Sequence, residues 1–321
     1  MTVFDDLARR WAMGGRGRQR GQIFPLMAIM MTGLVGMAAF VIDVGSWDRD
    51  SRSLQAAADA AALAGAEDLP YDQSGASTLA TTYATKNSGL TPIITFPSSN
   101  TIDVKLTHQA TGYFSPAVNS STSSVTISAE SKAQAGLVTQ AQGAVPLVVN
   151  KTLGQLTACN GIPCFNTSVT LKINDDTSLG GGQAGLIDLR TNGDGSVTAQ
   201  QIADWVTNGL STPMPANTYY YSAGSCKFSN QSFHTALDAK VASASPLLFP
   251  VYDPAQTDTT TSPPRYYIVG WAAFVVTSYR LNGCGNKSDF ITGYFVHLVT
   301  DGTSDGSATA DYGVRVVTLI N

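Results

Sequence analysis

The sequence predicts an α+β protein, with a long N-terminal transmembrane, pilin-like helix followed by β-rich exported domains that carry short helices. Three observations support this fold class. Residues 21–42 contain no charged side chain, alanine dominates the segment after them, and much of the remainder alternates apolar and polar residues. An apolar stretch of about 20 residues crosses a hydrocarbon core of about 30 Å. Alternation over four to eight residues is typical of half-buried strands.

The charges around the apolar stretch predict its orientation. Residues 1–20 carry five arginines, including Arg16, Arg18 and Arg20, against two aspartates, and Asp43 opens the far side. The positive-inside rule then makes 1–20 a cytoplasmic basic tail, 21–42 a single transmembrane helix and the rest extracytoplasmic. A cleaved secretory signal is the alternative, but no small-residue cleavage site closes the stretch before Asp43. We expect Asp43 to lie at the membrane surface and to cap an outer helix.

The alanine-rich segment predicts that helix continues beyond the membrane, over about 22–67, as one helix or two collinear ones. Alanine has the highest helix propensity, and Pro70 stops the pattern. One side of the outer half carries small residues, so another backbone can approach it closely. We expect a partner protein to dock there, although an alanine-rich helix that covers the chain's own core has the same pattern. The helix-packing residues are Leu54, Ala57, Ala58, Ala61, Leu63 and Gly65.

Two β-rich units are expected after the span. Residues 43–145 predict a pilin-like helix pair with a small antiparallel sheet, in which the second helix covers 74–88 and strands cover 101–107 and 124–130. Residues 146–321 predict a larger β-rich domain with short helices at 198–208 and 230–243. Its strands are expected at 147–149, 169–173, 266–277, 290–299 and 314–320.

The four cysteines all lie in the second unit. An even number in an exported part favours disulfides, with three pairings open. Turn residues between Cys159 and Cys164 favour a short loop, which leaves Cys226 to pair with Cys284. A metal site is the alternative, but it needs closer Cys spacing or neighbouring histidines.

No catalytic, cofactor-binding or metal-binding residue is predicted. An EF-hand alignment on Gly195 places Arg190 at the first ligand position and Gln201 at the twelfth, where the loop needs an acid and a glutamate. A turn that leads into a helix is therefore expected at 188–201. The histidines His108, His234 and His297 are scattered, which disfavours an exported hydrolase. A net charge of −4 gives no reason to expect nucleic acid.

The N-terminal part of the chain resembles a known family. Arg20-Gly-Gln, the apolar span, Val41-Ile-Asp-Val-Gly45 and Leu54-Gln-Ala-Ala-Ala-Asp-Ala-Ala-Ala-Leu-Ala-Gly-Ala66 resemble the TadE/TadG-like proteins of the Flp (tight adherence) pilus system. Two departures stand out. Leu26 and Met27 occupy the positions of the Glu and Tyr that follow the processing glycine in related pseudopilins, which favours the unprocessed, TadG-like side. The Asp-x-Ser-x-Ser metal motif of some TadG-like chains is absent from the sequence.

The resemblance implies a non-enzymatic minor pilin-like or assembly component of a Flp (Tad) pilus or secretion machine. Its partners would be other pilus or secretion-machine proteins, bound through the N-terminal helix, the membrane itself, and another copy of this chain in a homo-oligomer. It would reside in the inner or cytoplasmic membrane, or enter the surface filament. A membrane-tethered adhesin or ligand-binding protein, independent of any pilus, is the alternative function.

Overall fold

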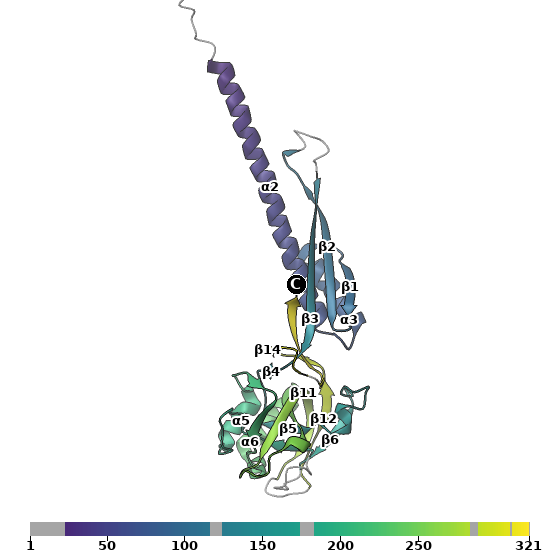
Figure 1. Ribbon diagram of the computed structural model, residues 1–321, viewed down its shortest axis with the longest axis vertical. Coiled ribbons are helices and arrows are strands. Elements are labelled where there is room, and N and C mark those ends of the chain that lie inside the picture. Colours follow the sequence, from purple (N-terminus) through teal and green to yellow (C-terminus); the bar gives the residue numbers. More distant parts are fainter. Residues whose placement is uncertain (1–22, 116–123, 174–182, 283–287, 309, 321) are drawn as a thin grey trace, which may run out of the picture.

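The computed structural model describes residues 23–115, 124–173, 183–282, 288–308 and 310–320. The molecule is elongated, and its long axis follows one helix (Figure 1). A narrow sheet lies beside the lower half of this helix, and a broader β-rich body lies beyond it, at the end opposite the N-terminus. The predicted fold class, a long apolar helix followed by a β-rich part with short helices, is confirmed.

The N-terminal helix, α2 (Ile23–Ala66), is a single element rather than two collinear ones. Pro25 lies in its first turn, where a missing N–H breaks no intrahelical bond. No further proline occurs before Pro70, and the alanine run keeps helix propensity high to the end. The helix therefore passes without a break from an apolar half to a half that packs on a sheet.

The first sheet has five strands in the order β1-β2-β3-β15-β13. One face is covered by the second half of α2 and by a second helix, α3, which starts at an Asp72 cap and ends at Gly89 in the left-handed conformation. Small helix residues meet the aliphatic side chains of β2, so this core is thin and closely packed. The bounds are α3 Gln73–Ser88, β1 Ile93–Ser98, β2 Thr101–Thr111, β3 Ser124–Leu137, β13 Leu298–Val299 and β15 Val314–Ile320.

The second sheet, in the distal body, has seven strands in the order β6-β12-β11-β10-β5-β7, with β9 also paired to β11. Helices α5 and α6 lie together on one side of this body (Figure 1). Aromatic side chains, including Phe233, Phe249 and Phe274, fill the core that these helices share with the sheet. The strands are β5 Leu147–Asn150, β6 Ser168–Lys172, β7 Ala184–Leu186, β9 Thr218–Tyr221, β10 Leu247–Tyr252, β11 Arg265–Arg280 and β12 Phe290–Val296, and the helices are α5 Ala199–Asn208 and α6 Gln231–Ser243.

Short elements fill the junction and the loops. A three-stranded sheet of order β14-β4-β8 lies near the junction between the first sheet and the distal body (Figure 1). The short strands are β4 Gln140–Ala141, β8 Met214–Pro215 and β14 Gly302–Thr303, and the 3-10 helices are η2 Gly154–Leu156, η3 Ser225–Ser229 and η4 Pro254–Gln256.

The last strand returns to the first sheet. β15 pairs antiparallel with β3, from Arg315 opposite Leu137 to Ile320 opposite Lys132. The expected strand at 314–320 is therefore present, but it lies in the sheet beside α2 rather than in the distal body. The division of the chain at 145/146 stays a prediction, and β13 and β15 both lie in the first sheet although they come after it in the sequence.

Candidate functional site: the membrane-facing helix and its contacts

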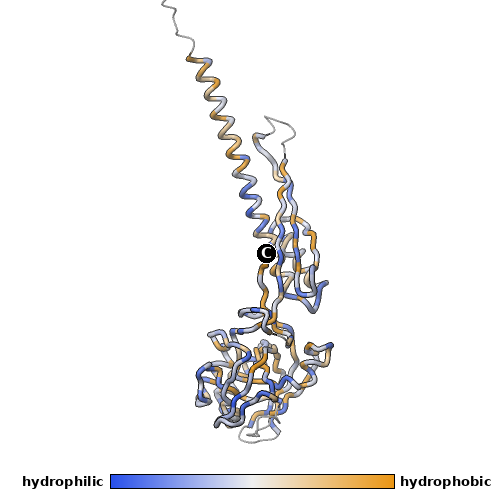
Figure 2. Tube along the Cα trace, in the orientation of Figure 1, coloured by the Kyte–Doolittle hydropathy of each residue, from blue (hydrophilic) through white to orange (hydrophobic). Residues whose placement is uncertain are grey.

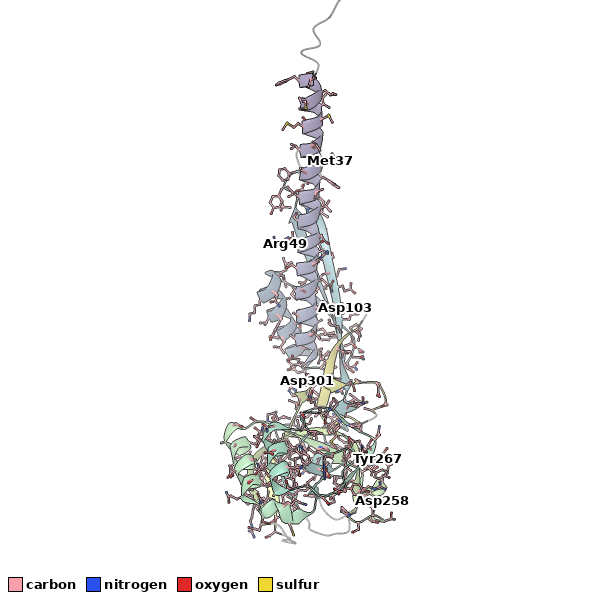
Figure 3. All side chains as sticks on the ribbon, turned by 90° about the vertical axis from the view of Figure 1, so that its left-hand side faces the viewer. Met37, Arg49, Asp103, Asp258, Tyr267 and Asp301 are labelled. Carbon is pink, nitrogen blue, oxygen red and sulfur yellow. A yellow bond between two sulfur atoms is a disulfide. The ribbon has the colours of Figure 1, made fainter. Side chains whose placement is uncertain are left out.

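The first half of α2 is an apolar surface that the rest of the chain leaves uncovered. Figure 2 shows the upper part of the helix as predominantly hydrophobic and the part below it as more polar. The side chains from Ile23 to Val41 project into open space, as the region around Met37 illustrates (Figure 3). Among the described residues, α2 is the one helix long and apolar enough to cross a membrane.

The span also contains small residues that leave room for a neighbour. A Cβ atom added at Gly33 or Gly36 would meet no atom within 4 Å. In lipid, small residues let two helix backbones approach closely, which strengthens van der Waals packing between them. This part of α2 therefore has the composition of a helix–helix contact surface.

Asp43 does not cap a helix, because α2 continues through it for a further 23 residues to Ala66. Its side chain instead binds the end of the β2–β3 hairpin. Three successive backbone N–H groups donate to its carboxylate: Tyr113 to Oδ1 at 2.8 Å, Phe114 to both oxygens at 3.1 and 3.0 Å, and Ser115 to Oδ2 at 2.6 Å. The side chain is only 1% exposed. We call this contact the Asp43 clamp.

The clamp favours the ionised form of Asp43. Burial alone raises the pKa of a carboxyl group, but the backbone donors Ser115, Tyr113 and Phe114 outweigh it, so the pKa of Asp43 lies below its usual range. Successive N–H groups that converge on one anion form a binding concavity of the kind known as a nest. The sequence predicted the position of Asp43 at the end of the span but not this partner, which lies some seventy residues further along the chain.

The alanine face of the outer half is already covered by this chain. Ala58 and Ala61 are fully buried, and α3 with strands β2 and β3 packs against this face. At Gly65 an added Cβ would lie 2.6 Å from Ile102 Cδ1 and 2.9 Å from the Ala76 carbonyl oxygen, so only glycine fits there. A partner would have to displace the chain's own sheet to reach this face. Leu54, Ala57 and Leu63 belong to the same core or pack against it.

A buried ionic cluster ties the first sheet to the α2–α3 connection. Arg315 on β15 pairs with Asp311, and it donates to the Ala135 carbonyl oxygen at 3.0 Å. The Tyr71 hydroxyl donates to Asp311 Oδ1 at 2.6 Å. The Tyr71 ring also packs edge-on against Phe165 of the distal body, with centroids 5.0 Å apart. The sequence signal of this cluster is a charged residue, Arg315, within the otherwise uncharged strand 314–320.

Three of the four cysteines lie in the described part of the chain, and all three are disulfide-bonded. Cys159 and Cys164 form a disulfide with Cα atoms 5.2 Å apart. Cys226 is also disulfide-bonded, and its predicted partner Cys284 lies outside the described residues. The topology arginines Arg16, Arg18 and Arg20 likewise lie outside the described part of the chain.

The Asp188–Gln201 segment folds around an arginine. Arg190 donates to both oxygens of Asp188 at 2.9 and 2.6 Å and to Asp194 at 3.2 Å. Burial raises the pKa of Asp188, but its bonds to Arg190 prevail and lower it. A cation would have to displace this guanidinium. Thr198 then caps α5 through a capping box with Gln201, which is the turn-then-helix arrangement predicted for this segment.

The histidines lie on separate elements. His108 is on β2, His234 is on α6, where its ring nitrogen lies 2.7 Å from the Phe228 carbonyl oxygen, and His297 follows β12 beside Tyr71 and Phe165. Across the described ranges, no group of three or more His, Cys, Asp or Glu residues is placed to hold a metal ion.

The fold and these contacts define a class of protein: a single helix able to span a membrane, mounted on an elongated α+β body. Residues 21–68 match the model of the family described as putative Flp pilus-assembly TadE/G-like. This match covers the N-terminal helix, whose resemblance to the TadE/G-like family is thereby confirmed. Comparisons with curated proteins and with solved structures find no match.

Proposed function

We propose that this protein is a non-enzymatic, minor pilin-like or assembly component of a Flp (Tad) pilus or secretion machine. A single helix at 21–42 anchors it in the cytoplasmic membrane, with the basic tail in the cytoplasm and the β-rich part outside. It acts by packing this helix against other helices of the machine and by presenting its distal body to further components.

One observation carries the proposal: within α2, the part from Ile23 to Ile42 is uncovered, whereas the part from Leu54 to Ala66 has one face buried by the chain itself. An apolar helix surface of this extent is stable only in lipid or against other apolar helices. The match to the TadE/G-like family over this same helix supports a pilus machine as its setting. Arg190 pairs with the carboxylates of Asp188 and Asp194, which favours a structural role for these two acidic side chains.

The test is co-purification of pilus-machine proteins with the full-length chain from membranes in mild detergent. Gly33→Leu combined with Gly36→Leu should lower recovery of these proteins several-fold, because the added side chains block close helix approach in the span. The control is Met30→Leu combined with Met37→Leu, which changes two exposed apolar residues of the same span without filling a small site.

Both variants should remain in the membrane fraction after an alkaline wash, because neither adds a charge to the span. Recovery that stays unchanged in the glycine variant would reject the helix as the contact surface. Failure of the unaltered chain to bring down any pilus-machine protein would reject the proposed function itself.

A further inference from the structure

The β2–β3 hairpin is uncharged along its outer part. The sequence between Lys105 and Glu130 contains no Lys, Arg, Asp or Glu, and these two residues face each other across the hairpin. Beyond this pair of residues the exposed strand positions are threonine, serine and glutamine, as in the Gln109–Thr126 hydrogen bond, together with Val125. The charges of the hairpin are thus confined to the half that lies nearer the distal body.

The hairpin runs beside α2 toward its apolar half (Figure 1). Gln55 of α2 donates to the Glu130 carbonyl oxygen, so the Lys105–Glu130 pair, the last charged pair of the hairpin, lies beside Gln55. Asp43, which holds Tyr113, Phe114 and Ser115, lies twelve residues earlier, or about 18 Å along the helix axis at 1.5 Å per residue. The uncharged part of the hairpin therefore covers this interval.

The clamp fixes the hairpin end at one depth relative to the membrane. From Ile23 to Ile42 the helix rises about 30 Å, the thickness of a hydrocarbon core, and Asp43 is the next residue. The backbone of 113–115 is bonded to Asp43, so it lies at the level where the hydrocarbon gives way to lipid headgroups.

The side chains at this level are aromatic and open. Tyr113 is 72% exposed and Phe114 is 45% exposed, although the backbone beneath them is held by a buried carboxylate. Tyrosine and tryptophan concentrate at membrane interfaces, where the ring contacts acyl chains and the polar atom meets water. Trp47 lies one helical turn beyond Asp43, but it is half-buried with its indole nitrogen covered by the protein, so it adds little to this exposed aromatic surface.

We propose that the β2–β3 hairpin end is a second membrane contact, in which the Asp43 clamp holds Tyr113 and Phe114 in the lipid headgroup region beside the span. The inference rests on the proposed single-span anchor. Lipid is the occupant that the geometry favours, because the exposed rings continue the uncovered apolar surface of α2 and the hairpin arms leading to them lack charge. The contact would set the tilt and rotation of the body relative to the bilayer, which a lone helix leaves free.

The experiment uses the full-length chain reconstituted in phosphatidylcholine vesicles that contain nitroxide-labelled lipids, with the label near the headgroup or deep in the acyl chain. A cysteine introduced by Tyr113→Cys carries an environment-sensitive fluorophore. Met37→Cys in the span and Tyr219→Cys in the distal body are the matched positions, and the chain without an added cysteine sets the labelling background. We expect the shallow quencher to reduce emission at 113 several-fold more than at 219, and the deep quencher to act most strongly at 37.

The positions separate the two ideas. Quenching at 37 with none at 113 would overturn the hairpin contact and leave the anchor in place, whereas no quenching at 37 would overturn the anchor and the contact together. If the emission at 113 is insensitive to the lipid quenchers and changes only when pilus proteins are added, the hairpin end contacts a protein rather than lipid. That result would overturn the proposal.

Asp43→Ala tests the clamp in the same vesicles. It removes the acceptor of the three backbone N–H groups and leaves the span apolar, so quenching at 113 should fall several-fold while quenching at 37 is unchanged. Undiminished quenching at 113 would show that Asp43 does not position the hairpin. Asp43→Asn keeps one amide oxygen as an acceptor and should give an intermediate value.

Discussion

Side-chain size at single residues sets how closely α2 lies against its neighbours. Ala58 and Ala61 are fully buried, and a Cβ atom added at Gly65 would lie less than 3.0 Å from atoms of Ile102 and Ala76, which is closer than van der Waals contact. Protein interiors are packed as densely as organic crystals, so a side chain enlarged at such a position has nowhere to go. Ala58 and Ala61 are therefore core residues of the first sheet, and the surface of α2 that the chain leaves uncovered lies nearer the N-terminus.

Ala58→Leu should destabilise the fold, by about 1–3 kcal/mol as for other overpacked cores. The matched control is Ala56→Leu on the exposed side of the same helix, which should leave the unfolding midpoint nearly unchanged. Thermal unfolding of both full-length variants in detergent micelles measures the difference. Equal midpoints for the two variants would show that this face of α2 is not packed as described.

Single-residue roles were the hardest features to predict from the sequence. The sequence places Asp43 at the end of the span. From its neighbours in the sequence, Asp43 was predicted to cap a helix, but in the structure it binds the backbone N–H groups of residues 113–115. The argument against calcium at 188–201 needed only the charge of Arg190, and in the structure this side chain pairs with Asp188 and Asp194. Long-range hydrogen bonds depend on tertiary placement, which periodicity does not encode.

At the scale of elements, local patterns predicted helices and long strands well. Residues 74–88 correspond to α3, 198–208 to α5 and 230–243 to α6, because caps and apolar spacing are local signals. The strand predicted at 124–130 extends to Leu137, since β15 pairs with its second half. No bounds were predicted for the edge strand β1, although its residues alternate between exposed and half-buried positions, and the strand β10 was missed because it is apolar and buried throughout.

The loop before β11 offers a test of an ion pair by pH. Asp258 accepts from the Thr260 hydroxyl at 2.6 Å and from Arg265 Nε at 3.1 Å, and these bonds hold the pKa of Asp258 at about 2. A carboxyl group with a lowered native pKa stabilises the fold above its unfolded pKa of about 3.9. That contribution is lost as the pH falls through about 2.

Hydrogen exchange of a peptide covering 257–266 should therefore keep its protection down to about pH 4 and lose it toward pH 2, after correction for intrinsic rates. A peptide from α5 serves as the internal reference for global unfolding. Asp258→Asn should remove the pH-dependent step in the loop. A step that persists in this variant would assign the titration to another group.

At the scale of the whole molecule, the return of β15 to the first sheet brings the last strand of the chain beside β3 and the second half of α2. Its first residues, Val314, Arg315 and Val316, are buried, whereas Thr318 to Ile320 are exposed. The sequence predicted the strand itself from its alternation, but not its sheet. Pairing between β3 and β15 joins residues some 180 positions apart, and no local pattern specifies a partner at that separation.

A chain ending after Gly313 should lose about 3 kcal/mol or more of stability, because it loses buried valines and leaves the Asp311 carboxylate without its arginine. A chain ending after Val317 removes only the exposed end of β15 and should unfold at nearly the midpoint of the intact protein. Limited proteolysis and thermal unfolding in micelles compare the two. Similar behaviour would mean that β15 adds little to the first sheet.

The returning strand also has a mechanical consequence. β3 leads out of the first sheet toward the distal body, and β15 comes back beside it in antiparallel pairing. A force that pulls the distal body away from the bilayer would thus act on two strands instead of one. It would load the hydrogen bonds between β3 and β15 in shear, so that they resist together rather than break one after another. A protein tethered in this way would withstand stretching better than one joined by a single linker.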